Sequence, residues 1–175
     1  SSAASDVYKR QANKALVDAV SDMEGVAVFN LYELSQEIVF NIDEWSKIIS
    51  DASAVIYQFP FYWMSAPSLL KKWQDEVFTF LSKTPAVAGK PLTVVTTTGS
   101  EYEAYRSGGR NRFTTDELLR PYQVNAIHSG MSWQTPIVVY GMGTADAGKN
   151  IAEGANLYKQ RVEMLIGNSN AGNNW

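Results

Sequence analysis

The sequence contains no cysteine and only one histidine. Without cysteine the chain forms no disulfide or iron–sulfur cluster and has no thiol nucleophile, and one histidine leaves too few ligands for a zinc site. We therefore expect no metal centre. A reducing compartment fits this composition, and we predict a cytoplasmic protein.

A surplus of positive charge and a long apolar run are also lacking. The chain has 15 basic and 18 acidic side chains, so no basic excess is available to neutralise a nucleic-acid backbone. No run approaches the roughly 18 apolar residues that a membrane span needs, and no basic stretch followed by an apolar segment begins the chain. We expect no nucleic-acid partner, no membrane span and no export signal.

The 175 residues are 45% apolar, which is enough for the core of one domain. Short apolar runs typical of buried parallel strands cover residues 26–29, 54–57, 92–95 and 137–140. Helical spacing of apolar residues covers residues 15–20, 42–49, 69–81 and 151–166. This alternation predicts an α/β fold with a parallel sheet, and the first helix precedes every strand.

Several helix ends carry capping signals. Ser65 is the candidate N-cap of the helix over residues 69–81, with Pro67 in its first turn. Thr114 and Glu117 have the spacing of a capping box, and Pro121 limits or kinks the helix that follows.

The most informative loops follow the second and third strands. The aromatic sequence FPFYWM occupies residues 59–64, and TTGS occupies residues 97–100. Ligands of open α/β sheets bind outside the carboxyl ends of strands, so both loops lie where a ligand is expected. Aromatic faces and backbone amides beside a Thr-Thr-Gly turn suit a flat heterocycle with polar edges, such as a flavin. Core or dimer packing of the aromatic residues and a simple strand-ending turn are the alternatives.

Residues 100–113 form a connection that is longer than a routine one and is a candidate lid. Tyr102 and Tyr105 can stack or donate a proton, and three arginines can meet an anionic group such as a nucleotide phosphate. These are Arg106, Arg110 and Arg112. A solvated mobile loop is the alternative. The one histidine, His128, falls near the end of the fourth helix, and we interpret it as structural.

The segment QFPFYWMSAPSLLKKWQDEVF, residues 58–78, closely resembles the NAD(P)H:quinone oxidoreductases of the flavodoxin-like superfamily. The match continues through GKP at residue 89, TTG at 97, YRSGGRN at 105, ELLRP at 117 and GM at 130. It is most similar to the bacterial group that includes ancillary subunits of glutathione-gated potassium efflux systems and modulator-of-drug-activity proteins. The resemblance covers about residues 12–166.

This resemblance implies a three-layer, doubly wound parallel sheet with the strand order 2-1-3-4-5. It also implies non-covalent binding of FMN or FAD, NAD(P)H and a quinone as substrates, and a homodimer with sites at its interface. By position, the expected flavin-binding residues are Asn13, Pro60, Phe61, Tyr62, Trp63, Met64, Thr97, Thr98, Gly99 and Ser100.

The implied reaction is a ping-pong transfer of hydride from NAD(P)H to the flavin and then to the quinone. Tyr105 falls at the position of the active-site tyrosine, where it would hydrogen-bond the quinone oxygen. Asn111 stands where the vertebrate quinone reductases have a histidine, so a proton relay through this position is not expected.

The start of the chain departs from the family. Family members begin with a central strand, followed by a loop and helix N-terminus that bind the flavin phosphate. Here residues 1–11 are unlike the family, and we interpret residues 5–11 as an artefact of sequence assembly that precedes the homologous part. We therefore expect a flavodoxin-like domain over residues 12–166 that lacks its first strand, and a flexible tail over residues 167–175.

Two other functions are compatible with the same fold. An electron-carrier flavodoxin shares it, although such carriers are usually more acidic than −3 and need no aromatic substrate cleft. A regulatory ancillary subunit that docks on a potassium efflux transporter is the stronger alternative, and the sequence does not separate it from a free-standing reductase.

Overall fold

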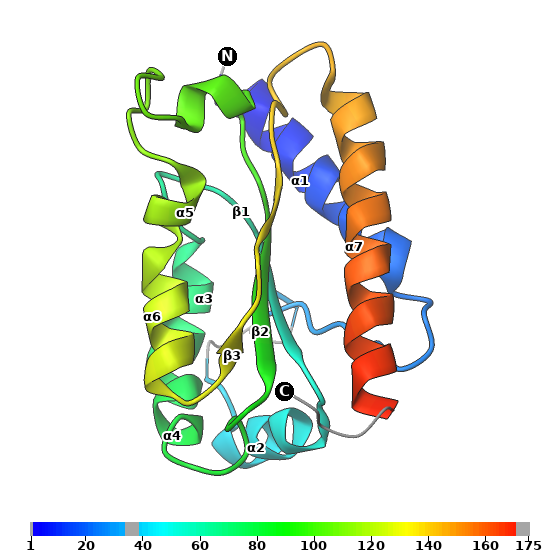
Figure 1. Cartoon of the computed structure of the whole chain (residues 1–175), viewed down its shortest axis with the longest axis vertical. Coiled ribbons are helices and arrows are strands. Elements are labelled where there is room, and N and C mark those ends of the chain that lie inside the picture. Colours follow the sequence, from blue (N-terminus) through cyan, green and yellow to red (C-terminus); the bar gives the residue numbers. More distant parts are fainter. Residues whose placement is uncertain (1, 34–38, 171–175) are drawn as a thin grey trace.

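The computed structural model describes residues 2–33 and 39–170 and shows three layers around one parallel sheet (Figure 1). The strands are β1 (Val55–Pro60), β2 (Pro91–Thr97), β3 (Ser132–Trp133) and β4 (Ile137–Val139). β2 is central: β1 pairs with one side of it, and β3 and β4 pair with successive parts of it on the other side. All pairs are parallel, which confirms the predicted fold class.

Helices cover both faces of the sheet (Figure 1). α1 (Ser2–Val20) and α7 (Ala147–Asn170) lie on one face, where Leu16 and Val162 belong to one apolar cluster with Val95 of β2. α3 (Ser68–Trp73), α5 (Thr115–Leu118) and α6 (Arg120–His128) lie on the other face. α2 (Ile42–Asp51) packs at the end of the sheet where the strands begin. The apolar periodicity of the sequence therefore locates both helical layers.

The prediction of a strand over residues 26–29 is wrong, because residues 26–30 have no regular structure and residues 31–33 form a turn. A strand exists only through a neighbour that completes its hydrogen bonds, and β1 pairs with β2 alone in the described part of the chain. No described strand precedes α1, in agreement with the expectation that the first strand of the family is missing here. Val26 and Leu31 still pack against the two apolar clusters.

The helix predicted over residues 69–81 consists of α3, a π-helical segment η1 (Gln74–Phe78) and the short α4 (Thr79–Leu81). Its N-cap is Pro67, which places Pro67 before the first turn rather than inside it. The prediction of Ser65 as N-cap is wrong, since Ser65 instead closes a tight turn by exchanging two backbone hydrogen bonds of 2.9 Å with Tyr62.

Other end signals are confirmed. Thr114 and Glu117 form a complete capping box at α5, and Pro121 lies in the first turn of α6, where no intrahelical donor is needed. α7 continues to Asn170, into the expected tail, and residues 171–175 lie outside the described residues. No helix in the described ranges combines the length and the apolar character that crossing a bilayer requires.

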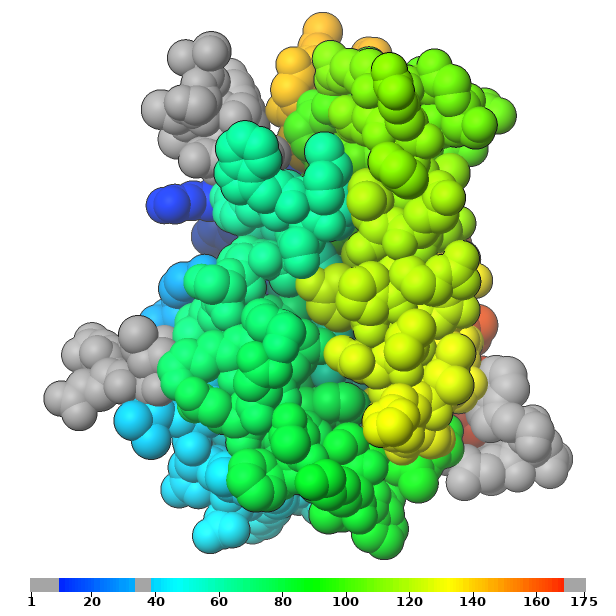
Figure 2. Space-filling model, turned by 90° about the vertical axis from the view of Figure 1, so that its left-hand side faces the viewer, coloured from blue at the N-terminus to red at the C-terminus, as the bar shows by residue number. Residues whose placement is uncertain are grey.

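Figure 2 shows the outer face of the layer that contains α3, α4 and α6. Large apolar side chains are exposed on the elements of this face and on the loops above them. They are Trp63, Met64, Phe80, Phe113, Val124 and Ile127. Apolar groups of this size that gather on one face are a common feature of protein–protein interfaces.

Candidate functional site

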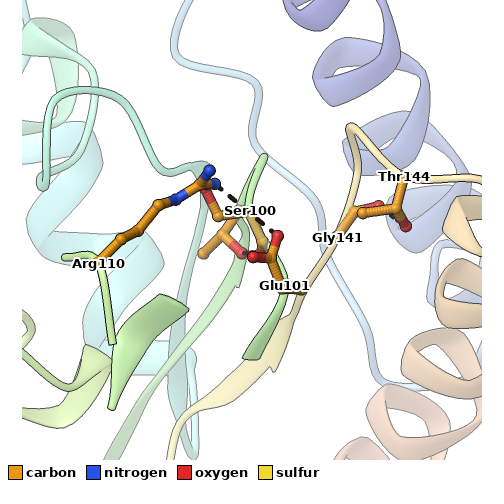
Figure 3. Close-up of polar contacts among 6 residues, drawn as sticks. Ser100, Glu101, Arg110, Gly141 and Thr144 are labelled. Carbon is orange, nitrogen blue, oxygen red and sulfur yellow. Dashed lines mark hydrogen bonds and ion pairs between the residues drawn. The ribbon is translucent and has the colours of Figure 1, made fainter. Parts of the chain in front are cut away.

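Three loops meet at the carboxyl end of the sheet. They are residues 61–65 after β1, residues 98–100 after β2 and residues 141–144 after β4. The last two are tied together, because the Met142 N–H donates to Thr98 O (2.9 Å), the Gly143 N–H to Gly99 O (2.9 Å) and the Gly141 N–H to Ser100 O (2.8 Å). Figure 3 shows Gly141 and Thr144 beside the chain that carries Ser100. The loop after β2 is therefore held from one side by its neighbour.

The aromatic turn after β1 presents Trp63 at its tip. Trp63 and Met64 have φ angles of 47° and 63°, in the left-handed region that residues with a Cβ rarely adopt. Trp63 is 99% exposed, and Met64 is also exposed. Such backbone strain and the exposure of a large apolar ring are typical of ligand-binding segments.

The residues at the base of this turn are packed inside the protein. Pro60 ends β1 opposite Thr97, and Phe61 is buried with its ring 6.1 Å from the ring of Tyr105. Tyr62 is partly buried. Of the five residues from 60 to 64, only Trp63 and Met64 thus present much of their side chains to solvent.

Tyr122 of α6 anchors the aromatic turn, and sequence reasoning missed it. Its hydroxyl accepts a hydrogen bond from the Ala66 N–H (3.1 Å) and lies 3.5 Å from Ser65 Oγ. The ring is buried among aromatic residues of the core. A tyrosine on the buried face of a helix needs a hydrogen-bond partner for its hydroxyl, so its position in the sequence could have indicated such a contact.

Thr97, which ends β2, and Thr98, which follows it, support the loop through their side chains. Asn13 Nδ2 of α1 donates to Thr97 Oγ1 (2.8 Å), which brings two predicted site residues into contact. Thr98 Oγ1 donates to Ser100 O (2.8 Å). The backbone N–H groups of Gly99 and Ser100 donate no hydrogen bond to any described residue, so this loop can offer them to a ligand.

Residues 101–113 form a compact loop rather than an open lid. A short 3-10 helix, η2 (Tyr102–Tyr105), starts it, and the Asn111 N–H donates to Ala104 O (3.0 Å). Gly109 packs so closely that a Cβ there would clash with the Glu103 carbonyl oxygen. This close approach explains Gly109, whereas Gly108 has a φ angle of 86°, which residues with a Cβ rarely adopt.

Arg110 fixes the loop to the end of β2. Its Nη2 donates to Ser100 Oγ (2.6 Å) and lies 3.8 Å from a carboxylate oxygen of Glu101 (Figure 3). Arg106 instead stacks over the ring of Tyr102, with 5.3 Å between the guanidinium carbon and the ring centroid. Arg110 and Arg106 therefore contact different groups. Arg110 bonds the loop after β2, whereas Arg106 packs on Tyr102.

Tyr105, the last residue of η2 in this loop, is buried. Burial raises the pKa of its phenol, while a hydrogen bond with Ser100 and the nearby Arg110 guanidinium lower the pKa in part. The net direction is upward, so the hydroxyl keeps its proton at neutral pH and can donate a hydrogen bond. Asn111 has a buried Nδ2 with no hydrogen-bond partner among the described residues, which leaves a second donor available.

His128 stands apart from these residues. It is the last residue of α6 and is exposed, and α6 ends beside β3, which pairs with the beginning of β2. It therefore lies at the opposite end of the sheet from the three loops.

The ring system of a flavin fits this end of the sheet. The backbone N–H groups of Gly99, Ser100, Trp63 and Met64 donate to no described residue, which matches the acceptor-rich edge of an isoalloxazine. The exposed Trp63 ring offers an apolar face. Asn13 lies in the interior of α1, so its backbone N–H belongs to the helix and only its side chain is directed to Thr97. The described residues therefore fit the isoalloxazine ring of a flavin, and they show no corresponding site for its phosphate.

Comparison with known proteins places the chain among flavodoxin-like proteins. Residues 1–162 match the family described as having the flavodoxin-like fold. General stress protein 14 of Bacillus subtilis is 34% identical over 156 residues, which are 87% of this chain and 89% of that protein. The glutathione-regulated potassium-efflux system ancillary protein KefG of Serratia proteamaculans is 35% identical over 133 residues, 74% of this chain and 73% of that protein.

Solved structures agree in fold. A protein described as a thermophilic tryptophan halogenase from Streptomycin violaceusniger has a TM-score of 0.80 at 34% identity, covering 86% of this chain and 89% of its own. General stress protein 14 of Treponema denticola, solved in complex with FMN, has a TM-score of 0.79 at 26% identity and covers 87% and 89%.

A third structure, an NADPH-quinone reductase from P. pentosaceus, has a TM-score of 0.69 at 25% identity and covers 84% of this chain and 88% of its own. The activities in these descriptions differ, so they do not single out one reaction. The sheet, the match over residues 1–162 and the relatives at 34–35% identity together show that this chain belongs to the flavodoxin-like family.

Proposed function

We propose that the protein is a flavin-dependent NAD(P)H:quinone oxidoreductase that binds FMN or FAD at the carboxyl end of the sheet. The observation that carries the proposal is the pair of loops with unused N–H groups, residues 63–64 and 99–100, together with the buried Tyr105, whose ring lies 6.1 Å from that of Phe61 at the base of the aromatic turn. The FMN complex of one structural neighbour and the name of another, an NADPH-quinone reductase, support it.

In this proposal the aromatic turn and the loop after β2 hold the two sides of the ring. Trp63 and Met64 supply apolar surface, and the N–H groups of Gly99 and Ser100 bond the ring edge. Asn13, Thr97 and Tyr122 act behind this surface, since their hydrogen bonds hold the two loops in place. When a flavin is bound, hydride passes from NAD(P)H to it and then to the quinone, with the oxidised nucleotide leaving in between.

Tyr105 is the proposed donor to the quinone oxygen. A phenol is protonated at neutral pH, and burial raises the pKa of Tyr105 further, so the hydroxyl can donate a hydrogen bond to negative charge that develops on that oxygen. Asn111 is the proposed second donor. An amide donates a hydrogen bond but does not relay a proton at neutral pH, so its contribution does not titrate.

The deciding experiment is a titration of flavin-free protein with FMN and FAD, followed by anaerobic stopped-flow absorbance. The bound flavin should be bleached by NADH or NADPH and reoxidised by menadione, with rates of the two half-reactions that account for turnover. A protein that binds no flavin, or whose bound flavin neither nucleotide reduces, would refute the proposal.

Asn111→Ala tests the role of the amide. The variant should slow reoxidation by quinone less than loss of the Tyr105 hydroxyl does, and the effect should be nearly independent of pH. Glu103→Gln is the control, because it changes an exposed side chain of the same loop. A strong pH dependence of the Asn111 effect would contradict the assignment.

We further propose a homodimer that forms through the face in Figure 2. Val124 and Ile127 of α6 are 52% and 64% exposed, and α6 lies beside the aromatic turn that Tyr122 anchors. Ile127→Glu should convert the dimer to a monomer in light scattering, whereas Leu157→Glu on the opposite helical layer should not. Dimers that persist in Ile127→Glu would exclude this face.

The similarity to KefG supports a second candidate function, an ancillary subunit of a potassium efflux transporter. Co-purification with such a transporter from membranes would favour it, and turnover of menadione by the isolated protein would establish only the reductase. One protein can be both a reductase and an ancillary subunit of a transporter. A cytoplasmic location is part of both proposals and remains a prediction.

A further inference from the structure

A groove of about 850 Å³ lies along the outer edge of the sheet. Figure 1 looks onto this edge, where β3 and β4 have β2 as their one partner among the described strands and run between α5 and α6 on one side and α7 on the other. Residues 135–138 line its floor. No described residue of the aromatic turn 61–65 or of the loop 98–100 lines it, so it is separate from the proposed flavin site.

Large apolar and aromatic side chains line the groove from both of its walls. Tyr102 is 49% exposed and stands 5.3 Å from Tyr140, ring centroid to ring centroid. Leu157 and Met164 line the opposite wall, on α7, and are also exposed. Exposed apolar side chains on two facing walls indicate a binding groove for a ligand with a planar, apolar part.

Two guanidinium groups line the same groove. Arg106 stacks over Tyr102, and Arg161 Nη1 of α7 donates to Thr135 O (2.6 Å). Neither arginine forms an ion pair with a carboxylate within the described ranges, and Asp116 is the acidic residue among those that line the groove. The groove thus has a net positive charge carried by groups that bind phosphate well.

We infer that this groove binds the phosphorylated adenosine arm of a nicotinamide dinucleotide, with the adenine against Tyr102 and the ribose phosphate between Arg106 and Arg161. The inference rests on the proposed function, because the groove extends to Tyr105, the residue assigned to the quinone oxygen. Its volume is within the range of small-molecule sites. A phosphate on the adenosine ribose gives the two guanidinium groups an anion to bind, so NADPH is preferred over NADH.

The test is calorimetric titration of flavin-free protein with adenosine 2′,5′-bisphosphate, 5′-AMP and adenosine. We expect affinity to fall in that order. Arg106→Gln should weaken binding of the bisphosphate by roughly 10- to 100-fold, the effect expected for the loss of a charge-assisted hydrogen bond. Lys159→Gln is the matched control, because Lys159 is exposed on α7 and does not line the groove.

Arg161→Gln should weaken the bisphosphate to a similar extent, and Arg161→Lys should restore part of the affinity. Since Arg161 also bonds Thr135, the melting temperature of each variant is measured in parallel. Arg106 makes no such backbone bond to a described residue, so Arg106→Gln decides the question if Arg161→Gln unfolds. Equal affinity for adenosine and the bisphosphate, or unchanged affinity in Arg106→Gln, would overturn the inference.

Failure of this inference is distinguishable from failure of the proposed function. If the protein reduces menadione but Arg106→Gln leaves its affinity for the bisphosphate unchanged, the proposed reductase stands and the nucleotide site in the groove is refuted. If the protein binds the bisphosphate through both arginines but binds no flavin, the nucleotide site in the groove stands and the proposed reductase is refuted.

Discussion

Removal of the Trp63 ring should weaken flavin binding without weakening the fold. Trp63 is 99% exposed, so Trp63→Ala removes almost no buried surface from the protein itself. Both residues carry a Cβ, so the strain of the positive φ angle of 47° is the same in each. We expect a change in the free energy of unfolding of less than about 0.5 kcal/mol, as for other surface substitutions.

Flavin affinity should respond strongly to the same change. Full burial of a large apolar side chain contributes about 1.5–3 kcal/mol, so for a Trp63 ring covered by the flavin we expect a loss of about 1–3 kcal/mol. This loss corresponds to about 5- to 150-fold in the dissociation constant. Quenching of flavin fluorescence during titration of flavin-free protein measures it.

Phe80→Ala is the matched control for Trp63→Ala. Phe80 is 54% exposed and belongs to α4, at the opposite end of the sheet from the aromatic turn (Figure 1). It should lower stability more than Trp63→Ala because it loses more buried surface, and it should leave flavin affinity unchanged. Unchanged affinity in Trp63→Ala, or equal loss in both variants, would show that the Trp63 ring does not contact the flavin.

Three further predictions follow from particular contacts. Tyr105→Phe should slow reoxidation of the flavin by quinone by roughly 10- to 100-fold and leave reduction by NAD(P)H nearly unchanged, as stopped-flow absorbance would show; equal slowing of both steps points to positioning instead. Gly109→Ala should destabilise the protein by about 1–3 kcal/mol in urea unfolding, because its Cβ meets the Glu103 carbonyl oxygen; a neutral effect would mean that the loop opens freely. Hydrogen bonds with Thr114 hold the pKa of the Glu117 carboxyl below its ordinary 4.5, so the stabilisation they give is present above that pH and is lost as the pH falls through the lower pKa of the folded state. Glu117→Gln should therefore reduce the decrease of the melting temperature at acid pH. An unchanged decrease would exclude the cap as its source.

Local patterns predicted most helices correctly, because a helix satisfies its own backbone hydrogen bonds. Apolar spacing alone located α2 and α7, and the capping box of Thr114 and Glu117 marked the start of α5. The cap at Ser65 was the exception. Its hydroxyl chemistry suits an N-cap, but the backbone bonds between Tyr62 and Ser65 use that residue in a turn instead.

The apolar run at residues 26–29 shows what a pattern alone does not decide. The run has the composition of a buried strand, yet a strand needs a neighbour to complete its ladder, and the described chain offers none there. By contrast, the runs at residues 54–57 and 92–95 overlap with β1 and β2, which pair with each other. Pairing is a property of the assembled sheet, so the same kind of sequence gave a strand in one place and none in the other.

The sequence by itself determined the chemistry that is available at the candidate site: an aromatic turn, a Thr-Thr-Gly loop and a tyrosine among arginines. Only the tertiary structure decided which groups face a ligand. Thr97 and Thr98 turn their hydroxyls to Asn13 and to the backbone, while Trp63 extends into solvent. It also brought Tyr122 to the aromatic turn and Arg161 to the outer edge of the sheet, through contacts between segments far apart in the chain. Such contacts depend on the packing of helices against strands, which no local pattern encodes.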